Sequence, residues 1–114
     1  MNCMQRYCFA LDLKDNDDLI KQYEEHHRNV PDEIIRSITS AGITSMDIYR
    51  TGNRLFMVME TDDSFSFDRK KQADESNEEV QKWEALMWQF QQALPWSKET
   101  EKWLLLSHIF HLKQ

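Results

Sequence analysis

The segment from Tyr23 to His27 carries residue types that can transfer protons. Tyr23 and His27 are four residues apart, so on a helix they share one face with Leu19 and should point toward the protein interior. His26 lies about 100° further around such a helix and should be more exposed. An imidazole has an unperturbed pKa of about 6.5, so it can give and take protons at neutral pH. A core histidine that hydrogen-bonds a backbone carbonyl is the alternative interpretation, and both stay open here.

A second group of candidate residues lies between Trp83 and Trp88. Trp83 belongs to an apolar stripe, and Glu84 follows it directly. Aromatic rings bind the apolar C–H faces of sugars and other amphipathic ligands. The periodicity is also that of an ordinary core tryptophan. Trp88 and Trp96 lie off the main stripe and are expected to pack under the final loop or at a dimer contact.

Motifs for metals and nucleotides are missing from the sequence. There is no phosphate-binding glycine-rich loop, no C-x-x-C and no H-E-x-x-H. Cys3 and Cys8 have no second pair of ligands nearby, so Cys8 is expected to be a small core residue. His108 and His111 are three residues apart on a predicted strand, which places their rings on opposite faces and disfavours joint chelation. We therefore expect neither a metal nor a cofactor.

Length and composition limit the class of protein. The 114 residues and 13.8 kDa fit one domain. Lys and Arg total 14 and Asp and Glu total 20, and the resulting net charge of −6 argues against binding to a nucleic-acid backbone. No apolar run reaches the roughly 20 residues of a membrane span, and the start does not resemble a secretory signal. With two cysteines only, we expect a cytoplasmic protein without a disulfide framework.

The periodicity of apolar residues predicts the elements that position these candidates. Alternation predicts strands over residues 5–13, 43–50, 54–61 and 102–112, with a hairpin turn at 51–53. One helix should begin after the capping candidates at 15–18 and carry His27, and a second should follow Pro31 and end near Gly42. Residues 67–75 are weakly helical, and a clear stripe from Val80 to Leu94 predicts a helix closed by Pro95. This order predicts an α+β fold of the ferredoxin-like, split βαβ type.

Both faces of the predicted sheet carry apolar residues. Phe56 and Val58 lie on one face of their strand and Leu55, Met57 and Met59 on the other. The helices of this fold cover one face only, so a second layer must cover the open face. We expect that layer to be a second copy of the chain, packed sheet to sheet as a homodimer. Cover by residues 62–75 is the alternative.

Four short segments occur in an order that resembles the L-rhamnose mutarotase family, over roughly residues 4–112. They are Tyr23-x3-His27, Asp47-Ile48-Tyr49, Asn53-Arg54-Leu55-Phe56 and Gln81-Lys82-Trp83. The resemblance implies one mutarotase-like domain over residues 1–114, with an antiparallel sheet that bears helices on one face and forms a dimeric α/β-barrel. It also implies a cofactor-free isomerase that interconverts the α and β anomers of a 6-deoxy-hexose, with L-rhamnose first and L-fucose next.

The same resemblance assigns roles to individual residues. It implies that His27 is the catalytic proton donor, that Tyr23 binds the sugar, and that Trp83 is the first of a substrate-binding tryptophan pair. Glu84 stands at the second position of that pair, and we include it in the binding set. Two more positions depart from the family: Met46 replaces a sugar-binding tyrosine, and the run Val30-Pro31-Asp32-Glu33 lacks the usual tryptophan. These departures predict an altered pocket wall around an unchanged proton donor.

Mutarotation requires an acid near the ring oxygen and a base near the anomeric oxygen. We expect His27 to protonate the ring oxygen, Tyr23 to orient the sugar, Trp83 to stack on it, and Glu84 or a water it holds to serve the anomeric hydroxyl. One alternative is a non-enzymatic dimer that binds a sugar or another small ligand on the same fold. The other is a small cofactor-free monooxygenase-type enzyme, which would bind flat aromatic compounds.

Overall fold

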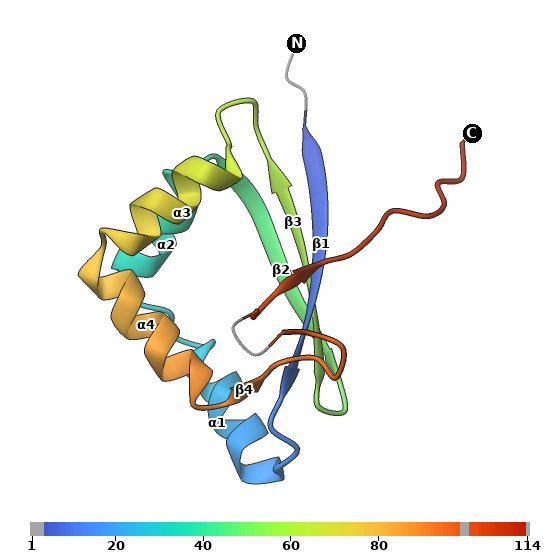
Figure 1. Ribbon diagram of the computed structural model, residues 1–114. Helices are drawn as coiled ribbons and strands as arrows, with labels where there is room; N and C mark the ends of the chain where they lie inside the picture. Colours follow the sequence, from blue (N-terminus) through green and yellow to red (C-terminus); the bar gives the residue numbers. More distant parts are fainter. Residues whose placement is uncertain (1–3, 99–100, 114) are drawn as a thin grey trace.

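The computed structural model describes residues 4–98 and 101–113, and Cys3 lies outside them. Its centre is an antiparallel sheet in the order β2–β3–β1–β4, with β5 also paired to β1. The helices α1 to α4 lie on one side of this sheet (Figure 1). The order and the one-sided helices confirm the predicted α+β, ferredoxin-like fold.

Three long strands make up most of the sheet. They are β1 (Gln5–Leu13), β2 (Ile43–Thr51) and β3 (Arg54–Thr61), which match the predicted ranges within one residue. The hairpin between β2 and β3 turns at Gly52, whose φ of +55° suits a residue without a side chain. The register pairs Phe9 with Met57 and Ile48 with Met57. These apolar side chains therefore share the face of the sheet that looks toward the helices.

Polar side chains begin three of the four helices. The helices are α1 (Asp17–His26), α2 (Asp32–Thr39), α3 (Phe67–Glu75) and α4 (Glu78–Trp88). The side-chain oxygen of Asn16 accepts a hydrogen bond from the amide of Leu19 at 3.0 Å. Ser66 and Asn77 cap α3 and α4 in the same way. The predicted cap at the start of α1 and the predicted helix at 67–75 are confirmed.

The helix predicted to reach Leu94 is shorter than expected. It ends at Trp88, and Gln91 and Gln92 form β4 (Gln91–Gln92) against the end of β1. Phe90 and Leu94 are nonetheless 4% and 2% exposed, so the apolar stripe predicted the burial of these two residues correctly. The chain reaches those buried positions in an extended form because the backbone of β1 offers hydrogen bonds there, such as Lys14 N to Phe90 O at 2.8 Å.

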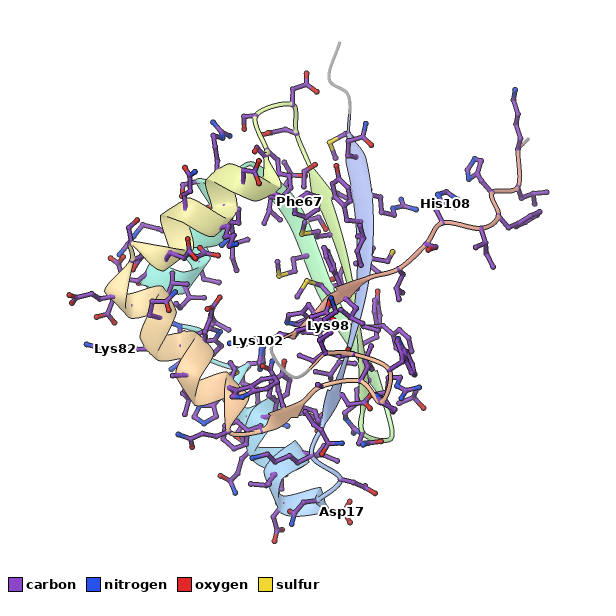
Figure 2. The ribbon with its side chains drawn as sticks, in the orientation of Figure 1. Asp17, Phe67, Lys82, Lys98, Lys102 and His108 are labelled. Carbon is purple, nitrogen blue, oxygen red and sulfur yellow. The ribbon has the colours of Figure 1, made fainter. Side chains whose placement is uncertain are left out.

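The strand predicted over residues 102–112 is mostly absent. Pairing is limited to β5 (Leu104–Leu105), followed by a hydrogen bond from Leu106 N to Cys8 O at 2.8 Å. The following segment, residues 107–113, runs away from the sheet (Figure 1) and exposes 92% of Ile109 and 74% of Phe110. Within one chain, no described element covers this segment, so its apolar residues have nothing to pack against. Figure 2 shows His108 in it, far from the helices.

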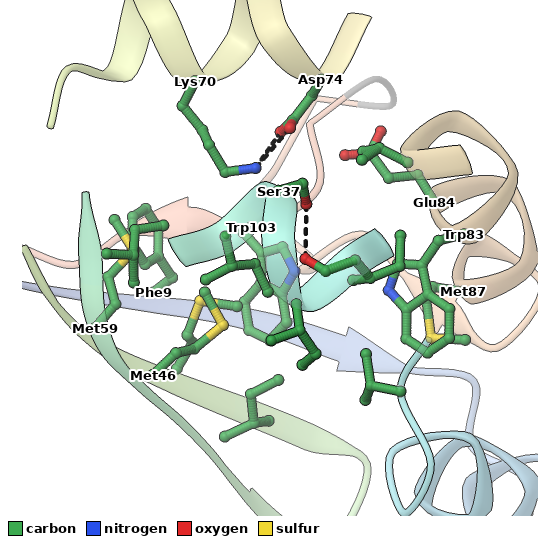
Figure 3. Close-up of a pocket in the computed structure, with 18 of the residues that line it drawn as sticks. Phe9, Ser37, Met46, Met59, Lys70, Asp74, Trp83, Glu84, Met87 and Trp103 are labelled. Carbon is green, nitrogen blue, oxygen red and sulfur yellow. Dashed lines mark hydrogen bonds and ion pairs between the residues drawn. The ribbon is translucent and has the colours of Figure 1, made fainter. Parts of the chain in front are cut away.

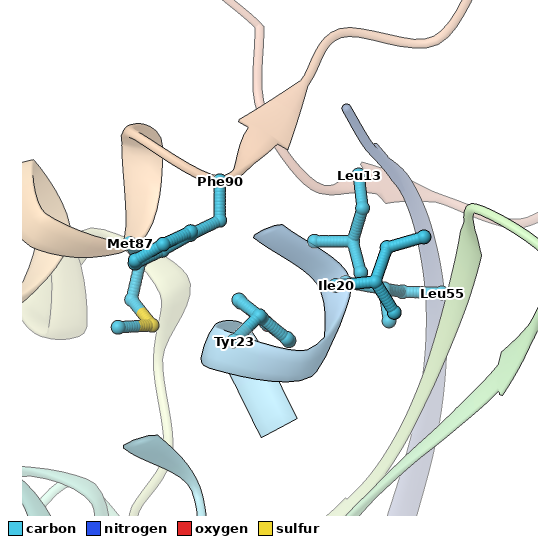
Figure 4. Packing of buried hydrophobic residues seen from close by; sticks show 6 residues of the cluster. All are labelled: Leu13, Ile20, Tyr23, Leu55, Met87 and Phe90. Atoms are coloured by element: carbon cyan, nitrogen blue, oxygen red, sulfur yellow. The ribbon is translucent and has the colours of Figure 1, made fainter. Parts of the chain in front are cut away.

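A hydrophobic core closes one end of the molecule. The buried residues of this core come from α1, α4, β1, β3 and the segment that directly follows α4. They are Leu13, Ile20, Tyr23, Leu55, Met87 and Phe90 (Figure 4). Tyr23 is 3% exposed in this cluster. The core thus fixes the end of α1, where Tyr23 and His27 lie, against the sheet. No helix of the described residues is both long and apolar enough to cross a bilayer.

Candidate functional site

A cavity of about 980 Å³ lies between the inner face of the sheet and helices α2, α3 and α4. Its volume is at the upper end of the range of about 300–1,000 Å³ seen in ligand pockets. The sheet contributes an apolar wall that consists of Phe9, Met46, Ile48, Met57 and Met59 (Figure 3). Beyond the core at the α1 end, the helices do not close on this wall, which leaves the space open to a ligand.

His27 lines this cavity from the end of α1. The sequence predicts His27 within the helix, whereas in the structure His27 is the C-cap residue that directly follows α1. Its Nδ1 lies 2.9 Å from the carbonyl oxygen of Tyr23. Because a carbonyl oxygen only accepts, Nδ1 carries a hydrogen, and Nε2 is the nitrogen left for a ligand. The backbone hydrogen bond expected of a core histidine is therefore present, but this histidine also faces a pocket.

Tyr23 lies at the junction of the core and the cavity. Burial raises the pKa of its phenol to about 12, although a hydrogen bond from Gln91 lowers it. The Nε2 atom of Gln91 is 3.5 Å from the Tyr23 hydroxyl, which is at the long limit for such a bond. The phenol therefore stays protonated at neutral pH and can act as a hydrogen-bond donor, not as a base.

Three aromatic rings form a row at this end of the cavity. The His27 ring is 4.4 Å from the Tyr23 ring, at an interplanar angle of 40°. The centroid of the same His27 ring is 5.6 Å from that of the Trp83 ring, at an interplanar angle of 68°. The imidazole is thus held by rings from α1 and α4, and Trp83 also packs against the core cluster. Rings held in this way have little freedom to change orientation.

Glu84 follows Trp83 on α4 and lines the same cavity. The residue is half-buried, and Figure 3 shows its carboxylate on the pocket side of α4. The four residues singled out from the sequence, Tyr23, His27, Trp83 and Glu84, are therefore brought to one cavity. Of the other departures from the expected family pattern, Met46 lines it as well, and so does Val30 of the run from Val30 to Glu33.

Several cavity residues were not found by sequence reasoning. Gln91 was placed inside a helix and Trp103 on a strand, yet both line the cavity. The ion pair Lys70–Asp74 on α3 was treated as part of a charged, weakly helical segment. The spacing of four residues between Lys70 and Asp74 was the available signal, since it places both on one helix face.

Other candidate sites lie apart from this cavity. His108 and His111 are in the extended final segment, with ring centroids 6.1 Å apart, and not on opposite faces of a strand. Cys8 is a half-buried free thiol on β1. Over residues 4–98 and 101–113, no three His, Cys, Asp or Glu side chains gather in a way that would hold a metal ion.

Comparison of the sequence with protein families finds a match over residues 6–112 to the family described as L-rhamnose mutarotase. An L-fucose mutarotase of Xanthomonas campestris pv. campestris is 43% identical over 113 residues, which cover 97% of this chain and 90% of the relative. A UPF0734 protein of Dictyostelium discoideum is 32% identical over 112 residues, with 93% and 88% covered.

Comparison with solved structures gives the same fold. The L-rhamnose mutarotase of Formosa agariphila superposes with a TM-score of 0.69 at 21% identity, over 96% of this chain and 99% of the other. Tetracenomycin F2 cyclase of Streptomyces glaucescens, a type-II polyketide cyclase, gives a TM-score of 0.55 at 15% identity, over 96% and 99%. At these identities the likeness concerns the fold alone.

Proposed function

The chain belongs to the L-rhamnose mutarotase family, a family of isomerases, and we propose that it interconverts the α and β anomers of a 6-deoxy-L-hexose. The family match supports L-rhamnose as the sugar, and the relative with 43% identity supports L-fucose. The observation that carries the proposal is the His27 imidazole, held between the rings of Tyr23 and Trp83 with Nε2 available to the cavity. An acid–base group fixed in a pocket is what ring opening requires.

The reaction needs two coordinated proton transfers. In ring opening, His27 acts as the imidazolium, with a hydrogen on both ring nitrogens, and its Nε2 donates a proton to the ring oxygen while the bond from that oxygen to the anomeric carbon breaks. The anomeric hydroxyl loses its proton to Glu84 or to a water that Glu84 holds, which leaves an open-chain aldehyde. Rotation about the bond from C1 to C2 presents the other face of the carbonyl. Reclosure returns one proton to the new anomeric oxygen and the other to His27, so atoms and charges balance.

The neighbours of His27 set its role in this mechanism. The hydrogen bond between Nδ1 and the Tyr23 carbonyl keeps Nε2 as the nitrogen that exchanges protons with the sugar. Trp83 offers a ring face on which the apolar C–H groups of the sugar stack. The neutral phenol of Tyr23 accepts a hydrogen bond from Gln91, and its own hydroxyl hydrogen is available to orient the sugar ring.

We further propose that the protein is a homodimer that packs through the outer face of its sheet. Phe56 and Val58 are half-buried on that face, and Tyr49 beside them is 60% exposed. The alternative cover by residues 62–75 is not what the chain forms, because Phe65 and Phe67 pack on Tyr7 from the inner side. The exposed final segment adds apolar side chains that a second copy would cover.

The remaining expectations follow from the family. We take residues 1–114 as a single mutarotase-like domain that works in the cytoplasm without a cofactor. Family membership supports an enzyme over a non-enzymatic sugar-binding dimer. It also disfavours a monooxygenase-type enzyme, since the likeness to the polyketide cyclase is one of fold.

Saturation-transfer NMR tests the proposed reaction directly. The exchange rate between the two anomeric proton signals of L-rhamnose, and separately of L-fucose, is measured with and without the protein at constant pH. We expect the protein to accelerate exchange for at least one of the two sugars, in proportion to its concentration. Tight sugar binding with an unchanged exchange rate would instead identify a binding protein. Indifference to both sugars would remove the proposed substrate class.

A further inference from the structure

Polar and charged side chains line the cavity on several sides, among them two groups on different helices. One is the end of α1, with His27, Tyr23 and Gln91, and the other is the inner side of α3, with Lys70 and Asp74. α3 lies at the end of the molecule opposite to α1 (Figure 1). The sheet wall of the cavity is mostly apolar, with Thr44 and Ser45 of β2 as its polar members. Lys70 and Asp74 are therefore a pair of charged groups on the α3 side of the cavity that the proposed reaction, with His27 and Glu84, does not use.

The Lys70–Asp74 pair differs from an ordinary surface ion pair. Its Nζ atom is 2.6 Å from Oδ1 and 2.7 Å from Oδ2, and the side chains are 19% and 18% exposed. The Glu79–Lys82 pair of α4, by contrast, exposes 56% and 73% of its side chains. α3 itself has no buried residue, and both side chains of the pair line the cavity. A shielded ion pair is a weak source of stability, because both charges lose water.

The geometry leaves hydrogen-bonding capacity on both partners. An ammonium has three donors and a carboxylate about four acceptor positions, and the contact between them uses only part of each set. A sugar hydroxyl is donor and acceptor at once, so it can bind the ammonium and the carboxylate together. Two adjacent ring hydroxyls can engage the pair in the same way. Figure 3 shows Lys70 and Asp74 on the cavity side of α3.

The position of the pair is tied to the helix that carries Trp83. Gln81 on α4 donates a hydrogen bond from Nε2 to the carbonyl oxygen of Asp74 at 2.9 Å. Trp83 and Glu84 follow two and three residues later on the same helix. The ion pair and the stacking ring are therefore held in a fixed relation, as recognition of one rigid ligand requires.

We propose that Lys70 and Asp74 form the subsite for the ring hydroxyls away from the anomeric carbon, and that they determine which 6-deoxy-hexose is accepted. The inference rests on the proposed function. L-Rhamnose and L-fucose differ in configuration at C2 and C4, so a pair that binds hydroxyls there separates them. Only the anomeric centre changes in mutarotation. Contacts elsewhere on the ring hold substrate and transition state alike, so their loss raises KM and leaves kcat nearly unchanged.

The test compares four variants by anomer-exchange NMR on both sugars. Asp74→Asn and Lys70→Met each remove one member of the pair, Asp74→Glu keeps the charge, and Lys82→Met is the control on an exposed pair. We expect Asp74→Asn and Lys70→Met to raise KM for the preferred sugar by about 10-fold or more, as loss of a hydrogen bond to a charged group does. The ratio of kcat/KM between the two sugars should shift, with kcat within about 3-fold. Asp74→Glu should recover part of the loss, and Lys82→Met should change nothing.

Unchanged KM values and an unchanged sugar ratio in folded Asp74→Asn and Lys70→Met would overturn the subsite. A uniform loss of kcat on both sugars would also overturn it, because that indicates a structural role. Should the wild-type protein accelerate neither sugar, the proposed function fails, and equilibrium binding by saturation-transfer difference NMR decides the subsite separately. Weaker sugar binding by Asp74→Asn than by wild type would support it, and equal binding or none by wild type would reject it.

Discussion

The carbonyl oxygen of Tyr23 accepts a 2.9 Å hydrogen bond from His27 Nδ1, while the two side-chain rings lie 4.4 Å apart. A single residue thus fixes both the tautomer and the orientation of the imidazole. The arrangement is possible because His27 stands at the C-terminal end of α1, where backbone carbonyls have no helical partner. Tyr23 in turn is fixed by the core, so the position of His27, the proposed proton donor, is a consequence of core packing.

Replacement of the imidazole should slow anomer exchange without unfolding the protein. We expect His27→Ala to lower the exchange rate by about 10²–10⁴-fold, the usual contribution of a positioned acid–base group. The matched control is His26→Ala. His26 contacts Phe90 at a ring distance of 5.4 Å and is not a cavity residue, so its loss should leave exchange nearly intact. A His27→Ala protein as fast as wild type would exclude His27 from the mechanism.

Removal of the stacking ring should weaken sugar binding. We expect Trp83→Ala to raise KM by about 2- to 10-fold, which corresponds to an aromatic contact of roughly 0.5–1.5 kcal/mol. Trp96→Ala is the control, since Trp96 is 67% exposed and contacts Arg54, and neither residue lines the cavity. Titration of each variant with sugar, followed by the exchange rate, gives the KM values. Equal KM values in the two variants would contradict stacking on Trp83.

Neutralising the carboxylate of Glu84 tests whether this residue is the base at the anomeric hydroxyl. Glu84→Gln keeps the size of the side chain but removes its ability to take a proton. We expect kcat to fall by at least about 10-fold with KM nearly unchanged, because proton transfer is lost and binding is kept. Glu79→Gln, whose parent side chain is 56% exposed and pairs with Lys82, should behave as wild type. An unchanged kcat in Glu84→Gln would assign the base elsewhere.

Stability should fall at alkaline pH through one tyrosine. Burial raises the Tyr23 pKa from 10.0 to about 12, so between these pH values the folded protein holds a proton that the unfolded chain has released. Stability is therefore fully present below about pH 10 and decreases as the pH rises toward 12. Urea unfolding across this range should show the decrease in wild type. The decrease should be smaller in Tyr23→Phe, and equal slopes would contradict the assignment.

The proposed dimer predicts a change of mass when its face is charged. We expect Phe56→Asp to convert the dimer into a monomer, because a carboxylate would be buried against apolar residues of the second copy. Deletion of residues 107–113 should weaken association in the same direction. Sedimentation equilibrium gives the mass, and Lys82→Asp on the exposed surface of α4 (Figure 2) is the control. A wild-type mass of 13.8 kDa would contradict the dimer.

Local patterns were enough to predict most of the fold. The alternation over residues 5–13 and 54–61 and the charged segment 67–75 gave elements with the bounds observed. The predictions are wrong where an apolar pattern indicates that residues are buried but does not indicate which backbone groups bond each other. Phe90 and Leu94 are buried as predicted, but their backbone bonds to β1 and not to a helix. The final segment alternates like a strand, yet beyond Leu106 it leaves β1, and no described element of one chain covers its apolar residues.

The candidate site was predictable only in part. The spacing of Tyr23 and His27 and the position of Trp83 led to the cavity because each belongs to a regular helical face. Gln91 and Trp103 enter the same cavity through long-range pairing with β1, which no local spacing reports. The Lys70–Asp74 pair has a spacing typical of solvated helix surfaces. Its shielding depends on the distance between α3 and the sheet, which follows from the tertiary fold.

The methionines of the cavity wall make this pocket sensitive to oxidants. Met46, Met57, Met59 and Met87 all line the cavity, and thioethers are readily converted to sulfoxides. Each sulfoxide would place a polar, chiral group where the wall is now pliable and apolar. Binding in the cavity should therefore decline under peroxide and return after treatment with methionine sulfoxide reductases.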